Sequence, residues 1–115
     1  MSAPSEPKDY ESVPDNPIAM FYGDLPQDEA EEAVKRLVPQ SARSFSDALT
    51  EVGWHAVPSA YVICENDQAL PAERQRGLAE RSDTVHRVVA DHSPFLSQPV
   101  QLAALLEEIS LASDA

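Results

Sequence analysis

The chain has 115 residues, 43% of them hydrophobic and 24% charged, which fits one small soluble domain. Twenty acidic side chains against eight basic ones give a formal charge of −12, so we expect neither a nucleic acid nor a membrane as a partner. One cysteine forms no internal disulfide, no apolar run reaches the ~18 residues of a membrane helix, and the first residues resemble no signal peptide, so we expect a cytoplasmic protein.

Proline, serine and acidic side chains dominate residues 1–17, and we predict a disordered lead segment there. Residues 18–57 come next and contain a clear helix signal over residues 26–37. Pro26 suits the first turn of this helix, and Pro39 ends the segment. Its apolar stripe is thin, so we expect the helix to cover another part of the molecule rather than to form a core.

Strands and helices alternate after Pro58. The unbroken apolar run at residues 60–64 predicts a strand buried on both faces, and residues 85–89 predict a second strand. A helix is predicted between them, over residues 71–81, and another begins at Pro99. The last helix carries a core-facing stripe made of Leu102, Leu105, Leu106 and Ile109.

The order strand, helix, strand, helix over residues 58–112 predicts the α/β class, with parallel strands and a right-handed crossover; residues 113–115 are a tail. Residues 41–53 have helical spacing over a short span and stay open between helix and loop. Two parallel strands do not make a stable sheet alone, because both faces and edges need cover. We therefore expect something beside the strand at 60–64, and a second copy of the chain is one such partner.

A polar loop follows each predicted strand. The first loop offers the carboxylate of Asp67 and the second the imidazole of His92. Either residue alone is also compatible with an ordinary turn. Parallel neighbouring strands would bring both loops to the same edge of the sheet. A carboxylate beside an imidazole fixes the tautomer of the ring and stabilises the imidazolium, so we expect the two side chains to meet as an acid–base pair.

Other candidate groups are sparse. Three histidines and one cysteine lie far apart in sequence, so we predict no metal site and no cofactor. Cys64 sits inside an apolar strand, which favours a buried structural thiol over a nucleophile. Phe21, Tyr22 and Trp54 are either core aromatics or the lining of a substrate pocket.

Several segments carry a family resemblance over residues 18–112. They are Phe21-Tyr22-Gly23-Asp24-Leu25-Pro26, Pro39-Gln40-Ser41, Trp54, Pro58-Ser59-Ala60-Tyr61-Val62, Asp67, Leu70-Pro71, Gln75 and Asp91-His92-Ser93-Pro94-Phe95-Leu96. Together they resemble the carboxyl-terminal half of α/β-hydrolase-fold esterases, in the branch that holds plant methyl-ester esterases, hydroxynitrile lyases and pyrethroid-hydrolase-like enzymes. The resemblance implies a partial α/β-hydrolase fold, with Asp67 as triad acid, His92 as triad base, and residues 18–57 as part of a cap over an acyl pocket.

The nucleophile of such a triad is missing. A nucleophile elbow needs Gly-x-Ser-x-Gly, and no two of Gly23, Gly53 and Gly77 have that spacing. The His-Gly type of oxyanion segment is absent as well. Ser93 stands beside His92 but has no elbow around it. We therefore expect the nucleophile to lie outside these residues, upstream of Met1.

Two functions from different classes follow. The first is the carboxyl-terminal half of a carboxylic-ester hydrolase, which bears the acid and base of a Ser-His-Asp mechanism and acts on a small ester only when an amino-terminal half completes it. Alone, it is expected to be inactive, because the oxyanion donors supply much of the rate enhancement. The alternative is a non-catalytic protein-interaction module that keeps the remnant fold.

Overall fold

Two short parallel strands organise the computed structural model of the chain, which describes residues 9–113. Strand β3 (Ala60–Cys64) pairs with β4 (Thr84–Val88), in a register that runs from Ala60 opposite Thr84 to Cys64 opposite Val88. Both segments are rich in β-branched residues, which fit a pleated, half-buried surface. Strand β3 has the predicted bounds, and β4 lies one residue earlier than the predicted 85–89.

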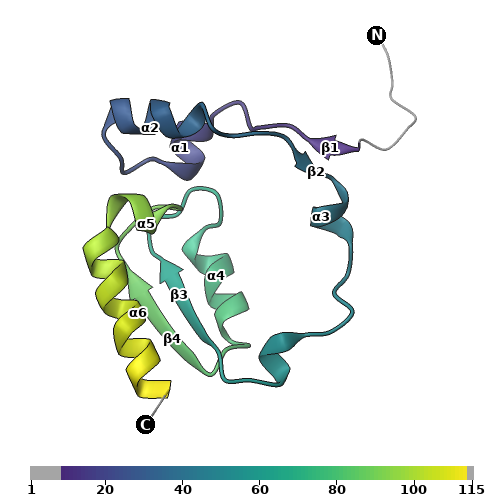
Figure 1. Cartoon of the computed structure of the whole chain (residues 1–115), viewed down its shortest axis with the longest axis vertical. Helices are drawn as coiled ribbons and strands as arrows, with labels where there is room; N and C mark the ends of the chain where they lie inside the picture. Colours follow the sequence, from purple (N-terminus) through teal and green to yellow (C-terminus); the bar gives the residue numbers. More distant parts are fainter. Residues whose placement is uncertain (1–8, 114–115) are drawn as a thin grey trace.

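Helices cover the sheet and cap its carboxyl end (Figure 1). The crossover helix α4 (Ala72–Ala79) packs against β3, and α6 (Pro99–Ser113) lies along the β4 side after the short α5 (Pro94–Ser97). Each begins just after or at a proline, which presets the backbone for a first turn. This arrangement confirms the predicted α/β class with parallel strands.

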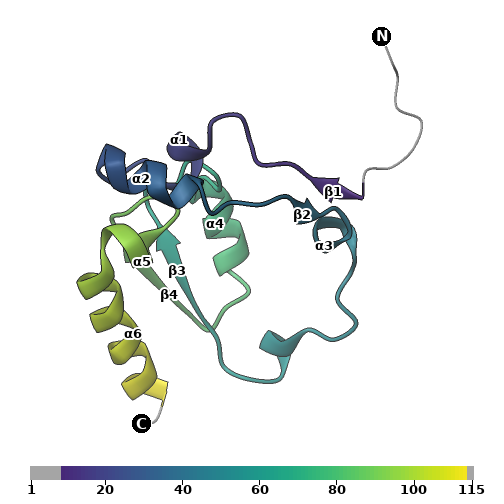
Figure 2. The ribbon, with the colours of Figure 1, turned by 45° about the horizontal axis from the view of Figure 1, so that its top comes forward.

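The preceding segment lies over the end of the sheet where the loops emerge. Helices α1 (Pro17–Phe21) and α2 (Gln27–Val34) are close to α5, as Figures 1 and 2 show. The predicted helix over residues 26–37 is therefore present but shorter. One side chain of α2, Ala30, is fully buried, which agrees with a thin covering stripe.

An extended arm (residues 38–58) then leads away from the sheet and returns to its opposite end (Figure 2). It contains β2 (Gln40–Ser41), α3 (Arg43–Ser46) and the 3-10 helix η1 (Gly53–His55). The open question over residues 41–53 is thus answered by a single short helix. Strand β1 (Tyr10–Glu11) pairs antiparallel with β2, so part of the predicted disordered lead is paired, whereas residues 1–8 and 114–115 lie outside the described residues.

The core is small. Its buried apolar side chains are Ala30, Ile63, Ala79, Val88 and Ala90. The prediction that the first strand is buried on both faces is wrong: within β3 only Ile63 is fully buried, and Ala60 is exposed. The reason is that the described chain gives β3 a neighbouring strand on one edge only.

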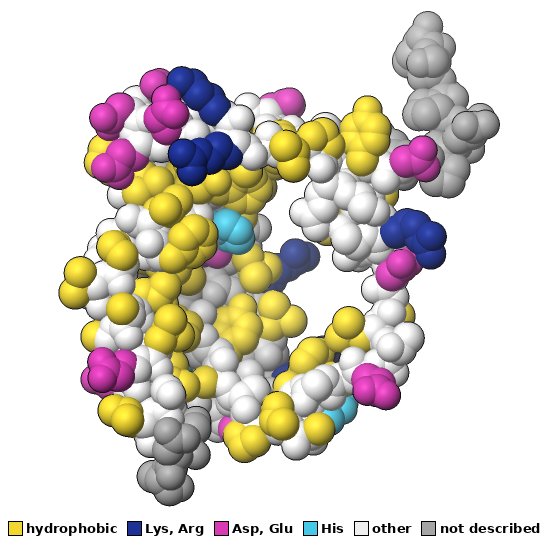
Figure 3. All heavy atoms as spheres, in the orientation of Figure 1, with side chains coloured by type: hydrophobic (Ala, Val, Ile, Leu, Met, Phe, Trp, Pro, Cys, Tyr) yellow, Lys and Arg dark blue, Asp and Glu magenta, His cyan; other side chains and the backbone are white. Residues whose placement is uncertain are grey.

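Apolar side chains remain on the surface. Figure 3 shows them gathered over α6 and the adjoining part of the sheet. On α6, Leu106 is 52% exposed, whereas Leu102, Leu105 and Ile109 of the predicted stripe are half-buried. None of the helices described over residues 9–113 is long and apolar enough to cross a bilayer.

Ile63, the one large side chain that is fully buried within residues 9–113, gives a direct test of this core. We expect Ile63→Ala to lower the free energy of unfolding by about 2–5 kcal/mol, because it leaves a cavity between β3 and its covering elements. Val100→Ala is the matched control, since Val100 is 82% exposed and its truncation is expected to stay within about 0.5 kcal/mol. Urea unfolding of both variants measures this, and equal effects would contradict the assigned core.

Candidate functional site

The loops that follow β3 and β4 meet through an aspartate and a histidine. Nδ1 of His92 lies 2.9 Å from Oδ2 and 3.1 Å from Oδ1 of Asp67. The Asp67 side chain is 5% exposed and that of His92 is 39% exposed. The contact expected from the strand order is therefore present, with the carboxylate on the inside and the imidazole at the surface.

The pairing of the strands continues into these loops. The amide of Glu65 donates to the carbonyl oxygen of Val88 at 3.0 Å, and the amide of Asn66 donates to Ala90 at 3.0 Å. The segments that follow β3 and β4 therefore leave the sheet at the same level. This is why residues 67 and 92 emerge side by side.

Asp67 is held by its own loop. Its Oδ1 accepts hydrogen bonds from the amides of Ala69 at 2.8 Å and Leu70 at 2.9 Å. Bonds to the ionised form favour a carboxylate, and a carboxylate only accepts. Nδ1 of His92 is therefore the donor, which assigns the proton of the neutral ring to Nδ1. The other ring nitrogen, Nε2, has no hydrogen-bond partner within residues 9–113.

Gln75, from α4, closes the base of the same loop. It is 2% exposed, its Oε1 accepts from the Cys64 amide at 2.8 Å, and its Nε2 donates to the carbonyls of Cys64 at 2.9 Å and Leu70 at 2.7 Å. The loop that carries Asp67 is thus tied at both ends to one buried amide. Gln75 is among the residues of the family resemblance, but the sequence gives no signal for this role.

Two of the three predicted pocket aromatics lie at the site. The ring of Phe21 is 5.2 Å from the ring of His92, centroid to centroid, at an angle of 43°. Tyr22 packs edge-on against Phe21 at 6.2 Å. The end of α1 therefore forms an aromatic wall beside the imidazole.

Trp54 does not join this wall. It lines a separate cavity of about 280 Å³ with Tyr61, Leu78 and the residues that flank the amino ends of the strands. The arm carries Trp54 to the end of the sheet opposite to the loops. The structure thus separates Trp54 from the pocket in which it was predicted.

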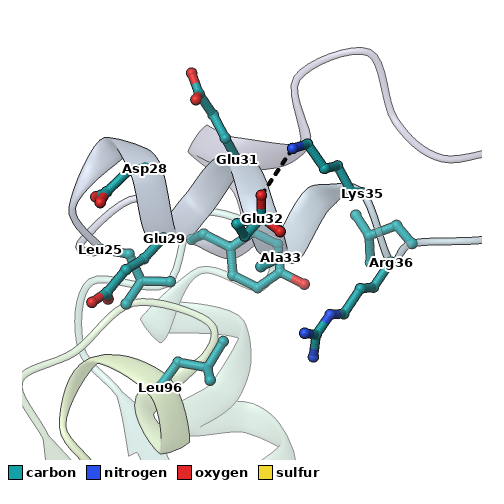
Figure 4. Close-up of a pocket in the computed structure, with 11 residues that line it drawn as sticks. Leu25, Asp28, Glu29, Glu31, Glu32, Ala33, Lys35, Arg36 and Leu96 are labelled. Carbon is teal, nitrogen blue, oxygen red and sulfur yellow. Dashed lines mark hydrogen bonds and ion pairs between the residues drawn. The ribbon is translucent and has the colours of Figure 1, made fainter.

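A larger hollow of about 870 Å³ opens under α2 (Figure 4). Its charged rim comes from α2 and the two residues that follow it, and it includes the Lys35–Glu32 ion pair at 2.8 Å. The apolar lining residues are Tyr22, Leu25, Ala33, Leu37 and Leu96. Leu96 belongs to α5, which directly follows the His92 loop. Neither Asp67 nor His92 lines the hollow, and its link to them is indirect, through Leu96 and through Tyr22, which packs against Phe21.

The strand beneath the pair keeps its titratable groups neutral. Burial raises the pKa of the Cys64 thiol, and the carboxylates of Asp67, Asp24 and Asp91 raise it further. Burial also raises the pKa of Tyr61, with Cys64 and Asp67 as weaker causes.

No group of three or more histidine, cysteine or acidic side chains within residues 9–113 is arranged to hold a metal ion.

The chain is similar to known proteins of one family. Residues 3–105 match the model of the "Alpha/beta hydrolase family". The chain is 31% identical over 94 residues to a protein named probable hydrolase R7 of Phoma sp. (strain ATCC 20986 / MF5453), which covers 76% of this chain and 38% of that protein. It is 33% identical over 66 residues to methylesterase 7 of Arabidopsis thaliana, which covers 55% of this chain and 25% of that protein.

Solved structures give the same result. The methylesterase MES16 from Arabidopsis superposes with a TM-score of 0.78 at 25% identity, over 95% of this chain and 50% of that chain. Polyneuridine aldehyde esterase superposes with a TM-score of 0.72 at 25% identity, over 83% of this chain and 40% of that chain. The chain therefore spans half or less of the length of these relatives. Because the family model covers most of its residues, the chain belongs to the alpha/beta hydrolase family.

Proposed function

We propose that this chain supplies the acid and base of an ester-hydrolase site that works by a Ser-His-Asp mechanism. The observation that carries the proposal is the contact of Nδ1 of His92 with both oxygens of the buried Asp67, which leaves Nε2 of the partly exposed ring without a hydrogen-bond partner within residues 9–113. The proton on Nδ1 forces the lone pair onto Nε2. A base of this form is what a serine nucleophile requires.

The proposed reaction has two halves. Nε2 of His92 takes the proton of the serine hydroxyl as its oxygen attacks the ester carbonyl, and then gives that proton to the departing alkoxide. In the second half, Nε2 takes a proton from water, hydroxide attacks the acyl-enzyme, and the proton returns to the serine. Asp67 stays ionised throughout, and it stabilises the imidazolium that forms in each half.

The serine itself is proposed to come from outside these 115 residues. No Gly-x-Ser-x-Gly segment is present. Ser93, next to His92, is 3% exposed, so its hydroxyl is poorly accessible to a substrate. Cys64 is disfavoured as a nucleophile because its raised pKa keeps the thiol protonated near neutral pH. The chain alone is thus proposed to be inactive.

A small carboxylic ester is the proposed substrate. The aromatic wall of Phe21 and Tyr22 beside His92 offers an apolar surface for the acyl group. The likeness to methylesterases and to polyneuridine aldehyde esterase supports this class of substrate. No metal ion or cofactor enters the proposed mechanism.

A second candidate, a non-catalytic interaction module, is favoured by the edge of β3. Alternate residues of a strand point their backbone groups to opposite edges, and the odd-numbered residues, such as Glu65, bond toward β4. The backbone of Ala60 and Val62 therefore faces the edge without a strand. Such an edge is a template for pairing, and under this candidate it joins two copies of the chain.

Hydrolysis tests the first candidate when the missing half is supplied. We expect residues 18–112, joined to the amino-terminal half of an Arabidopsis methylesterase that carries its serine, to hydrolyse a chromogenic acetate ester. His92→Ala is expected to lower the rate at least about a thousandfold, because it removes the base. His86→Ala is the matched control and is expected to keep the rate. An equal rate for the two folded variants would contradict the proposed role of His92.

The reactivity of Cys64 tests its exclusion as the nucleophile. Because burial and nearby carboxylates raise its pKa, we expect iodoacetamide to alkylate the native chain several-fold more slowly than the urea-unfolded chain at the same pH. Mass spectrometry follows the modification with time. A native thiol that reacts as fast as the unfolded one would restore Cys64 as a candidate nucleophile.

Sedimentation tests the second candidate. If the open edge joins two copies, the chain sediments as a dimer. Ala60→Pro is then expected to weaken the dimer several-fold, because proline is tolerated at the first residue of a strand and removes the outward N–H. A chain that remains monomeric at high concentration would contradict pairing through this edge.

A further inference from the structure

Asp91 links the two loops that carry the acid–base pair. Its side chain is almost fully buried, since the residue is 5% exposed. One carboxylate oxygen, Oδ1, accepts from the amide of His92 at 2.8 Å and from the amide of Gln68 at 3.2 Å. Gln68 directly follows Asp67. A single oxygen therefore fixes the backbone next to the acid against the backbone of the base.

The turn between α1 and α2 holds Asp91 from the other side. Oδ2 of Asp24 accepts from the Asp91 amide at 2.9 Å, across 67 positions of sequence. Hydrogen bonds between a carboxylate and a backbone N–H are about twice as strong as neutral ones. The segment before the sheet is thus tied directly to the loop of the base.

Gly23 makes this close approach possible. A Cβ atom built there would fall well inside contact distance of Oδ2 of Asp91, and it would lie 3.2 Å from the carbonyl oxygen of Ala19. Gly23 does not have a positive φ, so its backbone conformation is open to any residue. The constraint on position 23 is therefore space, and the neighbour that needs the space is Asp91.

We propose that Gly23, Asp24 and Asp91, here called the aspartate clasp, form a positioning device that sets the distance between Asp67 and His92. Asp91 acts through the backbone of the two loops, and the clasp makes no bond to either catalytic side chain. The clasp brings the carboxylates of Asp24, Asp67 and Asp91 near one another, and their mutual repulsion is unfavourable. The backbone amides that bind each carboxylate offset this repulsion.

The inference rests on the proposed role of the pair, but its test needs no hydrolysis. The full 115-residue chain is labelled with ¹⁵N, and long-range ¹H–¹⁵N spectra report which nitrogen of the neutral His92 ring carries the proton. We expect the Nδ1–H form to dominate in the unaltered chain. Asp91→Ala and Gly23→Ala are each expected to lower the ratio of the Nδ1–H form to the Nε2–H form by roughly tenfold, the size of one lost charge-assisted hydrogen bond.

Two variants separate positioning from general stability. Asp91→Asn keeps an oxygen that can accept from both amides, and it is expected to retain the Nδ1–H form. Gly77→Ala adds a methyl group with nothing within 4 Å, and it is expected to leave His92 unchanged. The backbone amide spectrum of β3 and β4 shows in each case whether the sheet is intact.

Several results would overturn the clasp. One is an unchanged tautomer in both Asp91→Ala and Gly23→Ala, and another is an equal loss in Asp91→Asn or Gly77→Ala. If Asp91→Ala unfolds, Gly23→Ala decides alone. Loss of the whole sheet in that variant too would make these residues a general support of the fold and would also reject the proposal. If the chain takes no part in ester hydrolysis, the variants would still change the tautomer of His92. The proposed function and the aspartate clasp can therefore fail separately.

Discussion

The hydrogen bond between Asp67 and His92 is the interaction on which the account of this chain depends. It exists because β3 and β4 are parallel neighbours, so that their carboxyl ends lie at the same end of the sheet. The extra amide bonds of Glu65 and Asn66 carry the register into the loops. A slip of one residue in either strand would turn its loop away from its partner. The register of a two-stranded sheet thus decides whether an acid–base pair exists.

Much of this arrangement is predictable from local sequence. The β-branched run before Cys64 has the length and composition of a strand, and the loop residues Asp67 and His92 stand at equivalent places in consecutive strand–loop–helix units. The parallel topology explains why the two loops emerge at the same end of the sheet. The length of α2, by contrast, depends on the tertiary packing around Ala30, its one buried residue.

The remaining features depend on contacts far apart in sequence. Gln75 and Asp91 act on backbone groups of other segments, and no spacing rule connects Asp91 with Asp24 across 67 positions. The place of Trp54 depends on the path of the arm, which has little regular structure to predict. Strand β3 is less buried than its apolar run predicts. An apolar run shows which side chains could be buried, whereas the burial that is reached depends on the strands beside it.

The exposed edge of β3 agrees with a chain that spans half or less of its relatives. Gln75 satisfies the outward backbone groups of Cys64, so this edge is closed at the end nearest the site and open toward Ala60 and Val62. The loop of Asp67 thus keeps its shape without a neighbouring strand. The contact between Asp67 and His92 is therefore arranged by the described chain itself.

A double-mutant cycle tests the central interaction most directly. The unaltered chain, Asp67→Ala, His92→Ala and the double variant are unfolded with urea near pH 7. Contacts that each side chain makes separately, such as those of Asp67 with Ala69 and Leu70, cancel in the cycle. We expect a coupling free energy of about 1 kcal/mol or more between the two residues. Additive effects, within about 0.3–0.5 kcal/mol, would contradict it.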